Sequence, residues 1–251
     1  VAAAGQQIFC EKPLALELDK IDEALGVVAK AGVKLQVGFN RRFDKSYQRV
    51  REIVASGEIG RPCILRITNR DPDFPSMDFL RVSGGIFLDL AIHDFDMVRF
   101  QMGEVEEIYA MGGVLINPEL KEFGDIDTDV IVLRFTSGAV GTIDNSRKAV
   151  YGYDQRLEVF CSNGTALANN EAETAVVKGN TDGFLSAKPP YFFMQRYAPC
   201  YVEEVRQFVE CVRDDKPTPT NGADGRAAVV LGYAAWKSLR ENRPVKISEI
   251  R

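Results

Sequence analysis

The spacing of apolar residues over the first forty positions alternates between the period of a strand and that of a helix. Residues 8–10 form a short apolar run that Pro13 ends, because proline biases the preceding residue towards an extended conformation and cannot continue a strand. Residues 17–31 carry apolar side chains at spacings of three and four, which predicts an amphipathic helix ending at Gly32. A second strand is predicted over 33–39, so this segment indicates a βαβ unit with a parallel sheet.

After residue 39, one strand is predicted over residues 64–67, before a helix. Several strand-like runs then follow one another with turn signals rather than helices between them, at residues 105–114, 128–135, 139–146, 155–161 and 165–168. This pattern predicts an antiparallel sheet of about six strands. Helical spacing predicts helices over 44–56, from Gly84–Gly85 to Gly103, over roughly 198–213 and over roughly 222–241. The expected fold class is therefore α/β plus α+β. A parallel βαβ unit in residues 1–38 precedes a domain, residues 39–251, whose large, mostly antiparallel open sheet is covered by helices.

Composition and charge narrow the class of protein. The 251 residues are 45% hydrophobic and 27% charged, which is typical of a soluble globular protein. A net charge of −5 provides no basic face for nucleic acid, and no apolar run is long enough to span a membrane. The five cysteines are widely spaced and form no CxxC, so we expect neither a disulfide framework nor a metal site, and we expect a reducing, cytoplasmic compartment.

The chain has one histidine, His93, and Asp89 lies four residues before it. Residues i and i+4 of a continuous helix share a face, so the Asp89 carboxylate is expected beside the imidazole, where it would fix the ring's tautomer and orientation. Imidazole changes charge near neutral pH, so such a pair suits proton transfer. The alternative is that His93 is a satisfied core or surface residue without a chemical role.

Two further polar segments directly follow the predicted parallel strands, at the edge where open α/β sheets bind ligands. Glu11-Lys12-Pro13 follows the first strand and places the Lys12 cation at a cleft edge. Phe39-Asn40-Arg41-Arg42-Phe43-Asp44 follows the second strand and supplies two guanidinium groups. Asn40 and Arg41 are expected to face a cofactor or substrate, whereas a structural ion pair is an alternative role for Arg42.

Together these segments resemble the glucose–fructose oxidoreductase / inositol dehydrogenase / rhizopine catabolism (Gfo/Idh/MocA) family. Glu11-Lys12-Pro13 resembles its EKP motif, and Gly84 to Asp96 resembles its G-G-x-x-x-D-x-x-x-H-x-x-D motif. Residues 38–44 resemble its domain-junction segment. Tyr151-Gly152-Tyr153-Asp154 and the aromatic run from Tyr191 to Tyr201 resemble its inositol dehydrogenases. The resemblance covers essentially the whole chain.

The resemblance implies that a secondary hydroxyl of a cyclic polyol or sugar, similar to myo-inositol, is oxidised with NAD or NADP, of which NAD is favoured. It places the catalytic role on Lys12, Asp89 and His93. The cofactor is expected to meet Glu11, Lys12, Pro13 and Asn40. The substrate is expected to meet Lys12, Arg41, Asp71, Asp89, His93 and Tyr153. Asp94 and Asp96 are expected to be solvated or structural. The resemblance also implies a homo-oligomer, a dimer or tetramer, that forms through the open face of the sheet.

One departure from the family pattern is large. The G-x-G-x-x-G turn that binds a dinucleotide pyrophosphate does not occur in these residues, nor does the acidic residue expected to bind the adenosine ribose. Residues 1–38 therefore match only the C-terminal remnant of a dinucleotide-binding (Rossmann) domain, and the sequence is expected to be a fragment or a truncated form. By itself the chain is expected to be inactive. The alternative function is a truncated, non-catalytic member of the family that acts in ligand binding or oligomerisation.

Overall fold

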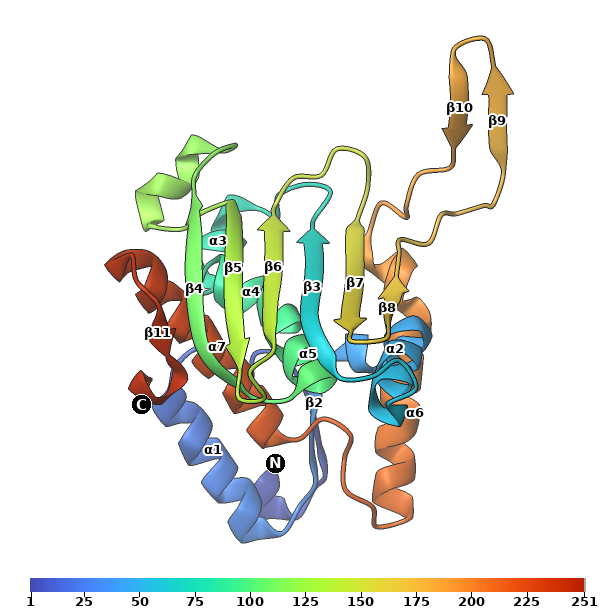
Figure 1. The fold of residues 1–251 in the computed structure, drawn as a ribbon. Helices are drawn as coiled ribbons and strands as arrows, with labels where there is room; N and C mark the ends of the chain where they lie inside the picture. Colours follow the sequence, from blue (N-terminus) through green and yellow to red (C-terminus); the bar gives the residue numbers. More distant parts are fainter. Residues whose placement is uncertain (251) are drawn as a thin grey trace.

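A small parallel sheet and a large, mostly antiparallel sheet carry the fold of residues 1–250, which the computed structural model describes (Figure 1). The helices are α1 Leu18–Ala31, α2 Lys45–Ser56, α3 Met77–Val82, α4 Ile86–Asp89, α5 Ile92–Met102, α6 Phe193–Arg213 and α7 Gly222–Glu241. The strands are β1 Ile8–Glu11, β2 Leu35–Gly38, β3 Pro62–Arg70, β4 Val105–Gly113, β5 Thr128–Phe135, β6 Val140–Ser146, β7 Asp154–Cys161, β8 Gly164–Ala168, β9 Val177–Asn180, β10 Gly183–Ser186 and β11 Val245–Lys246. The 3-10 helices are η1 Ala2–Ala4, η2 Asn40–Phe43, η3 Pro118–Phe123 and η4 Ile247–Glu249.

The predicted βαβ unit is confirmed. β1 and β2 pair in parallel from Ile8 opposite Leu35 to Glu11 opposite Gly38, and α1 connects them. α1 ends at Gly32, whose φ of 64° lies in the left-handed region that glycine adopts without strain. Because both strands run the same way, Lys12 and η2 follow their carboxyl ends at one edge of this sheet. The assignment of residues 1–38 to a separate dinucleotide-binding domain stays a prediction.

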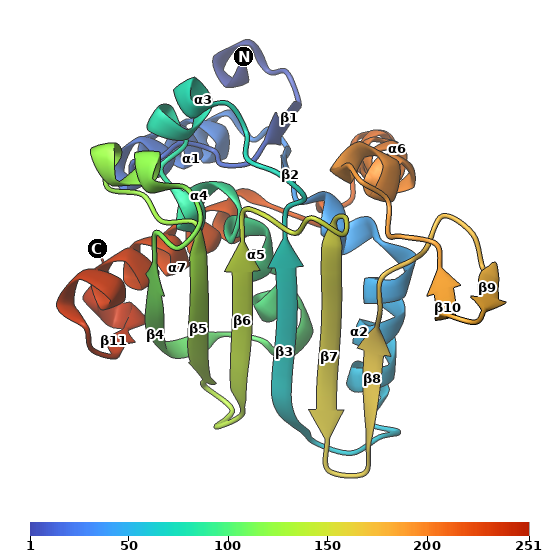
Figure 2. The same ribbon diagram turned by 90° about the horizontal axis from the view of Figure 1, so that it is seen from above.

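The large sheet has seven strands in the order β11-β4-β5-β6-β3-β7-β8, one more than expected. It is antiparallel except for β3 and β6, which pair in parallel with Arg70 opposite Ser146. The segments after these two strands therefore leave the sheet at the same edge. In Figure 2 the arrowheads of β3 and β6 point towards the side of the molecule that holds α4 and the β1–β2 pair. This edge is where the polar residues of the candidate site gather.

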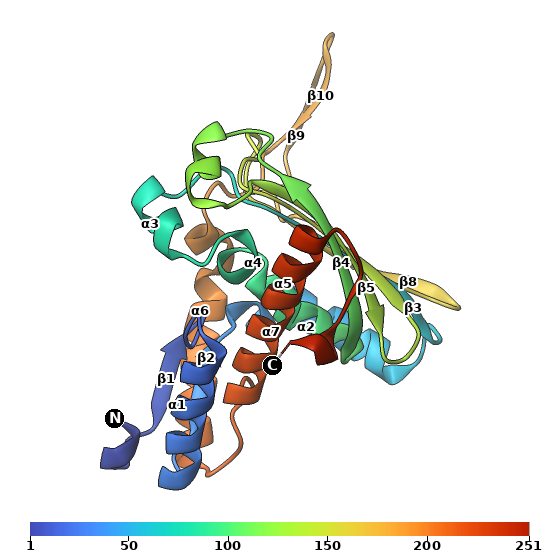
Figure 3. The ribbon, with the colours of Figure 1, turned by 90° about the vertical axis from the view of Figure 1, so that its left-hand side faces the viewer.

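Helices cover one face of the large sheet only (Figure 3). α5 and α7 pack on the inner face, where apolar side chains at alternate strand positions, such as Ile108, Ile131 and Ile143, are fully buried. The opposite face leaves Val130 and Val132 about half exposed. The open sheet face predicted from the sequence is therefore present. None of the helices described in residues 1–250 is long and apolar enough to cross a membrane.

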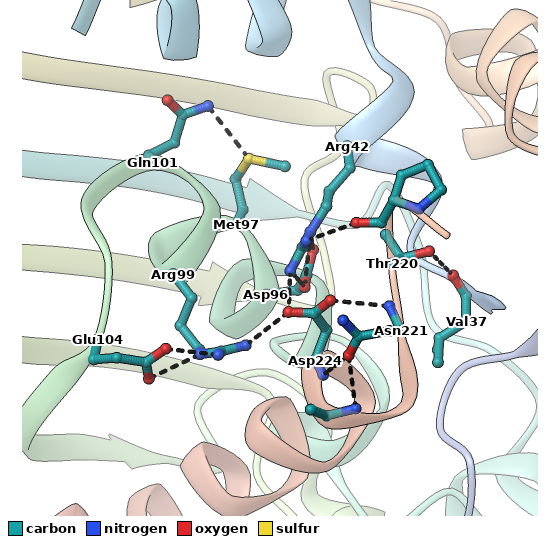
Figure 4. Close-up of polar contacts among 12 residues, drawn as sticks. Val37, Arg42, Asp96, Met97, Arg99, Gln101, Glu104, Thr220, Asn221 and Asp224 are labelled. Atoms are coloured by element: carbon teal, nitrogen blue, oxygen red, sulfur yellow. Dashed lines mark hydrogen bonds and ion pairs between the residues drawn. The ribbon is translucent and has the colours of Figure 1, made fainter. Parts of the chain in front are cut away.

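Charged side chains join η2, α5 and the start of α7 (Figure 4). Two nitrogens of Arg42 donate to the Asp96 carboxylate, and the same guanidinium contacts Asp224 at 3.0 Å. Arg99 contacts Asp224 at 3.2 Å and also pairs with Glu104. Asp224 thus accepts from two arginines of two different elements. Arg42 takes the structural role that the sequence left open for it, and Asp96 is its buried partner.

Two features of the fold were not predicted. The hairpin of β9 and β10 projects from the body of the molecule (Figures 1 and 3), and every residue of its two strands is exposed. With no buried face, it lacks the alternation that identifies a strand. The helix expected from Gly85 to Gly103 is also interrupted, because α4 ends at Asp89 and α5 begins at Ile92.

The turn that begins α4 depends on a glycine. Gly85 has φ 78° and ψ −177°, a conformation that is essentially confined to glycine. A Cβ atom at this position would lie 2.5 Å from Cζ2 of Trp236 and 2.8 Å from Oδ1 of Asp125. The backbone therefore approaches its neighbours at a distance that no side chain permits.

We expect Gly85→Ala to destabilise the protein more than Gly103→Ala, as measured by urea unfolding of the two variants. Gly103 has a similar conformation, with φ 86° and ψ −158°, but open space around it. Both substitutions carry a backbone strain of about 1–3 kcal/mol. The overlap at Gly85 adds a further cost of about 1–3 kcal/mol. Equal losses in the two variants would contradict the close packing around Gly85.

Candidate active site

A cavity of about 1060 Å³ opens where the two sheets meet. It collects predicted site residues from segments far apart in the sequence: Glu11, Lys12, Asn40, Arg41, Asp71, Asp89, His93 and Tyr153. Of the residues predicted for the site, only Pro13 does not line it. Polar groups from η2, α4, α5 and the ends of β1 and β3 thus face one cavity.

The Lys12 ammonium lies against the end of α4. Its Nζ donates to the backbone oxygen of Asp89 at 2.7 Å and lies 3.6 Å from Oδ1 of the same residue. Removal from water lowers the pKa of Lys12, the Asp89 carboxylate opposes that shift, and the Arg41 cation adds to it. Lys12 is thereby fixed as a hydrogen-bond donor at the wall of the cavity.

The contact predicted between Asp89 and His93 is absent. The hydrogen bonds and ion pairs of the Asp89 carboxylate within residues 1–250 go to Lys12 and Arg147, and Nδ1 of His93 is enclosed without a hydrogen-bond partner there. The prediction was wrong because it assumed one continuous helix. The break after α4 turns Asp89 off the helical face that carries His93.

The imidazole of His93 is held in a place that favours its neutral form. Its ring meets Phe39 edge to face, with 6.3 Å between the ring centroids. Desolvation lowers the pKa of His93 well below its usual value, and the cations of Lys12 and Arg41 lower it further. A neutral ring has a free lone pair, so it can accept a proton.

Arg41 is anchored in a buried polar network below the cavity. Its Nη1 donates to Oδ1 of Asp94 at 2.6 Å, and Oδ2 of Asp94 accepts from Asn69 and Asn145 at 2.6 and 2.9 Å. Asp94 is fully buried, so it is structural rather than solvated. Nη2 of Arg41 also lies 3.4 Å from the hydroxyl of Tyr153, so these two of the six predicted substrate contacts lie next to each other.

Asp71 follows β3 and lines the same cavity as Lys12. Desolvation raises the pKa of its carboxyl from 3.8 to about 6. The cations of Arg147, Arg41 and Lys12 oppose this shift, while the carboxylate of Asp89 adds to it. Asp71 therefore titrates in a range where a modest change of pH alters its charge.

Sequence reasoning missed two residues that support the site. Arg147 is completely buried, and its Nη1 contacts Oδ2 of Asp89 at 3.0 Å. Asp125 contacts Nη2 of Arg147 at 3.5 Å and accepts from the backbone N–H of Ile86, at the start of α4. The signal was the position of Arg147 after a predicted strand, but only the parallel pairing of β3 and β6 places that position next to Asp71 and Asp89.

The sequence analysis also did not identify the residues that line the outer part of the cavity. It is apolar and aromatic, and it consists of Pro72, Phe74, Pro75, Phe79, Phe192, Phe193 and Met194. The aromatic run that begins at Tyr191 was noticed in the sequence only as part of a resemblance. The cavity thus has a polar floor and an apolar rim.

The residues present fit one end of a nicotinamide dinucleotide. Oδ1 of Asn40 is a buried acceptor that has no hydrogen-bond partner in residues 1–250, and Asn40 lines the cavity beside Lys12. Glu11 lies at the carboxyl end of β1, the edge where such ligands bind. A glycine-rich turn that would hold the pyrophosphate does not occur in the sequence. These residues therefore fit the nicotinamide end of the dinucleotide rather than its pyrophosphate.

Comparisons with known proteins agree with this fold. The chain is 52% identical over 250 residues to a myo-inositol 2-dehydrogenase of Thermotoga maritima, matching 99% of this chain and 75% of the relative. The solved structure of a putative myo-inositol dehydrogenase from Sinorhizobium meliloti superposes with a TM-score of 0.94 at 41% identity, covering 98% of this chain and 75% of that one.

The structure of scyllo-inositol dehydrogenase from Lactobacillus casei with bound NAD(H) and scyllo-inositol gives a TM-score of 0.90 at 26% identity, covering 98% of this chain and 74% of that one. Residues 47–167 match the model of the GFO/IDH/MocA C-terminal domain. Because the Thermotoga maritima relative is 52% identical over 99% of the chain, the chain belongs to the Gfo/Idh/MocA family.

Proposed function

We propose that the protein is a dehydrogenase that oxidises a secondary hydroxyl of a cyclic polyol such as an inositol, with NAD as hydride acceptor. The observation that carries the proposal is the meeting of Lys12 and His93 in one cavity that is also lined by Asp71 and Arg41. The names of the relatives, which are inositol dehydrogenases, support the same substrate class.

The chemistry divides between two residues. His93 accepts the proton of the substrate hydroxyl, for which its neutral ring is suited, and general-base catalysis of this kind contributes about 10²–10⁴-fold. Lys12 donates a hydrogen bond to the same oxygen and stabilises the negative charge that develops there. When bound, the nicotinamide supplies the acceptor for the hydride that leaves the carbinol carbon.

A polyol would find both donors and acceptors on the walls of the cavity. The Asp71 carboxylate accepts hydrogen bonds from substrate hydroxyls when it is ionised. The Tyr153 hydroxyl and the Arg41 guanidinium lie side by side and can donate to hydroxyl oxygens. Asp89 holds Lys12 through its backbone oxygen and its carboxylate, so in this scheme its role is to position the lysine.

The cofactor assignment rests on Glu11, Lys12 and Asn40 at the edge of the small sheet. NAD rather than NADP is favoured because the Lactobacillus casei structure is described with NAD(H). Residues 1–38 would then form the part of a dinucleotide-binding domain next to residues 39–251. A cytoplasmic location is part of the proposal and is supported by the five cysteines, all of which are free thiols.

We further propose that copies of the chain associate through the open face of the large sheet. Exposed apolar side chains gather on its outer strand positions, namely Val130, Val132, Val140, Phe160 and Leu167. Ion pairs such as Arg66 with Glu158 lie among them. Exposed apolar side chains with a polar surround are typical of a protein–protein interface. Association would give a dimer or a tetramer.

We expect His93→Ala to lower kcat for inositol oxidation by about 10²–10⁴-fold because the proton acceptor is lost. Turnover is measured in a protein that joins this chain to an intact dinucleotide-binding segment, and NADH affinity is measured by fluorescence. Cofactor affinity should stay the same. Phe79→Ala, at the rim, is the control and should leave kcat nearly unchanged. An unchanged kcat in His93→Ala would remove His93 from the mechanism.

We expect kcat/KM for the polyol to rise with pH through about 6, as Asp71 loses its proton and becomes a charged acceptor. The sign of the stability effect is opposite. Because the folded-state pKa of Asp71 is raised, its contribution to stability is greatest below about pH 4 and is lost as the pH rises towards 6. Asp71→Asn should abolish the step in kcat/KM and flatten that part of the stability profile. A step that persists in Asp71→Asn would assign it to another group.

We expect the unmodified chain to have the mass of a dimer or tetramer in light scattering after size-exclusion chromatography. Val132→Glu places a charge in the centre of the open sheet face and should reduce the mass towards that of the monomer. Val209→Glu changes an equally apolar, exposed residue of α6 and serves as the control. A monomeric unmodified protein would contradict the proposed interface.

A further inference from the structure

Arg147 is the cation at the centre of a group of buried and half-buried carboxyls. It follows β6, and its side chain is 0% exposed. It contacts Asp89 at 3.0 Å and Asp125 at 3.5 Å, and it also lies near Asp71 and Asp129, whose carboxyl pKa values its charge lowers. An arginine so completely removed from water is costly unless its charge serves several partners.

The backbone around Arg147 is locked to the segment that carries Asp71. The N–H of Asp71 donates to the oxygen of Ser146 at 2.9 Å, and the N–H of Ala149 donates to the oxygen of Asp71 at 2.6 Å. Arg147 donates its own N–H to the oxygen of Asp127 at 2.9 Å. These bonds extend the parallel pairing of β3 and β6 past the sheet and place Arg147 and Asp71 side by side.

The contacts of Arg147 also reach the turn that carries Asp89. Oδ1 of Asp125 accepts from the N–H of Ile86 at 2.9 Å, and α4 runs from Ile86 to Asp89. Its Oδ2 faces Arg147. The first and last residues of α4 are therefore both tied to the same guanidinium, one through Asp125 and one directly.

We propose that Arg147 is a positioning residue of the active site, which orients Asp89 and the α4 turn so that Lys12 is held at the cavity wall. The role rests on the proposed dehydrogenase function. Arg147 does not line the cavity, so it acts through Asp89 rather than on the substrate. The planar guanidinium suits the task because it can contact two carboxylates from two directions at once, which a lysine ammonium on a flexible stem does less well.

The pKa of Asp71 supplies a readout of the charge on Arg147 that does not depend on turnover. The charged groups that face Asp71 are Arg147 after β6, Asp89 on α4, Arg41 on η2 and Lys12 after β1. Arg147 is the first of the cations that hold the pKa of Asp71 down. Removing its charge should therefore raise the pKa of Asp71 above about 6.

The test compares R147Q, which removes the positive charge, with R147K, which keeps the charge but replaces the planar guanidinium with an ammonium group. R226Q is the matched control, because Arg226 pairs with Asp22 at 2.9 Å on the surface between α1 and α7, away from the cavity. The pKa of Asp71 is measured by carboxyl-carbon NMR on this chain, and kcat and KM are measured in the protein joined to a dinucleotide-binding segment. Thermal melting verifies that each variant is folded.

We expect R147Q to lower kcat by about 10²-fold, the loss typical of a misplaced reacting group, with a smaller change in KM. It should also raise the pKa of Asp71. R147K should return that pKa towards about 6 while kcat stays low, and R226Q should change neither quantity.

An unchanged kcat in a folded R147Q would overturn the proposal, and so would an unchanged kcat in a folded R147K. If R147Q does not fold, R147K alone still tests the proposal. A low kcat in R147Q that R147K restores completely would also overturn it, because charge alone would then suffice. Failure of the proposed function is distinguishable, since the unmodified protein would then oxidise no polyol while the NMR titration still reports whether Arg147 faces Asp71.

Discussion

The fold depends on a short chain of charges that crosses from the small sheet to the large one: the Lys12 ammonium, the Asp89 carboxylate and the Arg147 guanidinium. Lys12 follows β1, Asp89 ends α4, and Arg147 follows β6. Asp89 accepts a hydrogen bond from Lys12 at its backbone oxygen and one from Arg147 at its carboxylate, so its position determines the position of the Lys12 ammonium. The Asp89 carboxylate is only partly exposed, and the two cations offset the cost of removing its charge from water. The candidate site is thereby built from residues that neighbour one another only in the folded chain.

Much of the fold could be predicted from the sequence, because the periods of its helices and strands are clear. The ends of α1 at Gly32 and α2 at Gly57 were predicted because glycine adopts their left-handed end conformation. The parallel pairing of β3 with β6 could not be predicted. Strand neighbours are set by contacts between distant residues, which the period of a single strand does not contain. The exposed hairpin of β9 and β10 was missed for the opposite reason, since it packs against nothing.

The structure brings the residues predicted for the candidate site together, but not in the contacts that the sequence indicated. Eight of the predicted residues line one cavity, because motifs that follow parallel strands come together at their carboxyl ends. The pairing of Asp89 with His93 failed because the chain bends between α4 and α5. Most of the segment is buried, polar residues included, so its pattern shows no single apolar face that would reveal the bend. Once the bend is present, Asp89 meets Lys12 and Arg147, while His93 lies beside Phe39 in surroundings that lower its pKa.

The most direct measurement is a crystal structure of the chain with myo-inositol bound. The account requires that a secondary hydroxyl oxygen of the polyol lies within hydrogen-bond distance of both Nζ of Lys12 and a ring nitrogen of His93. A polyol bound at the aromatic rim near Phe79 and Phe192, out of reach of the lysine and the imidazole, would contradict the account.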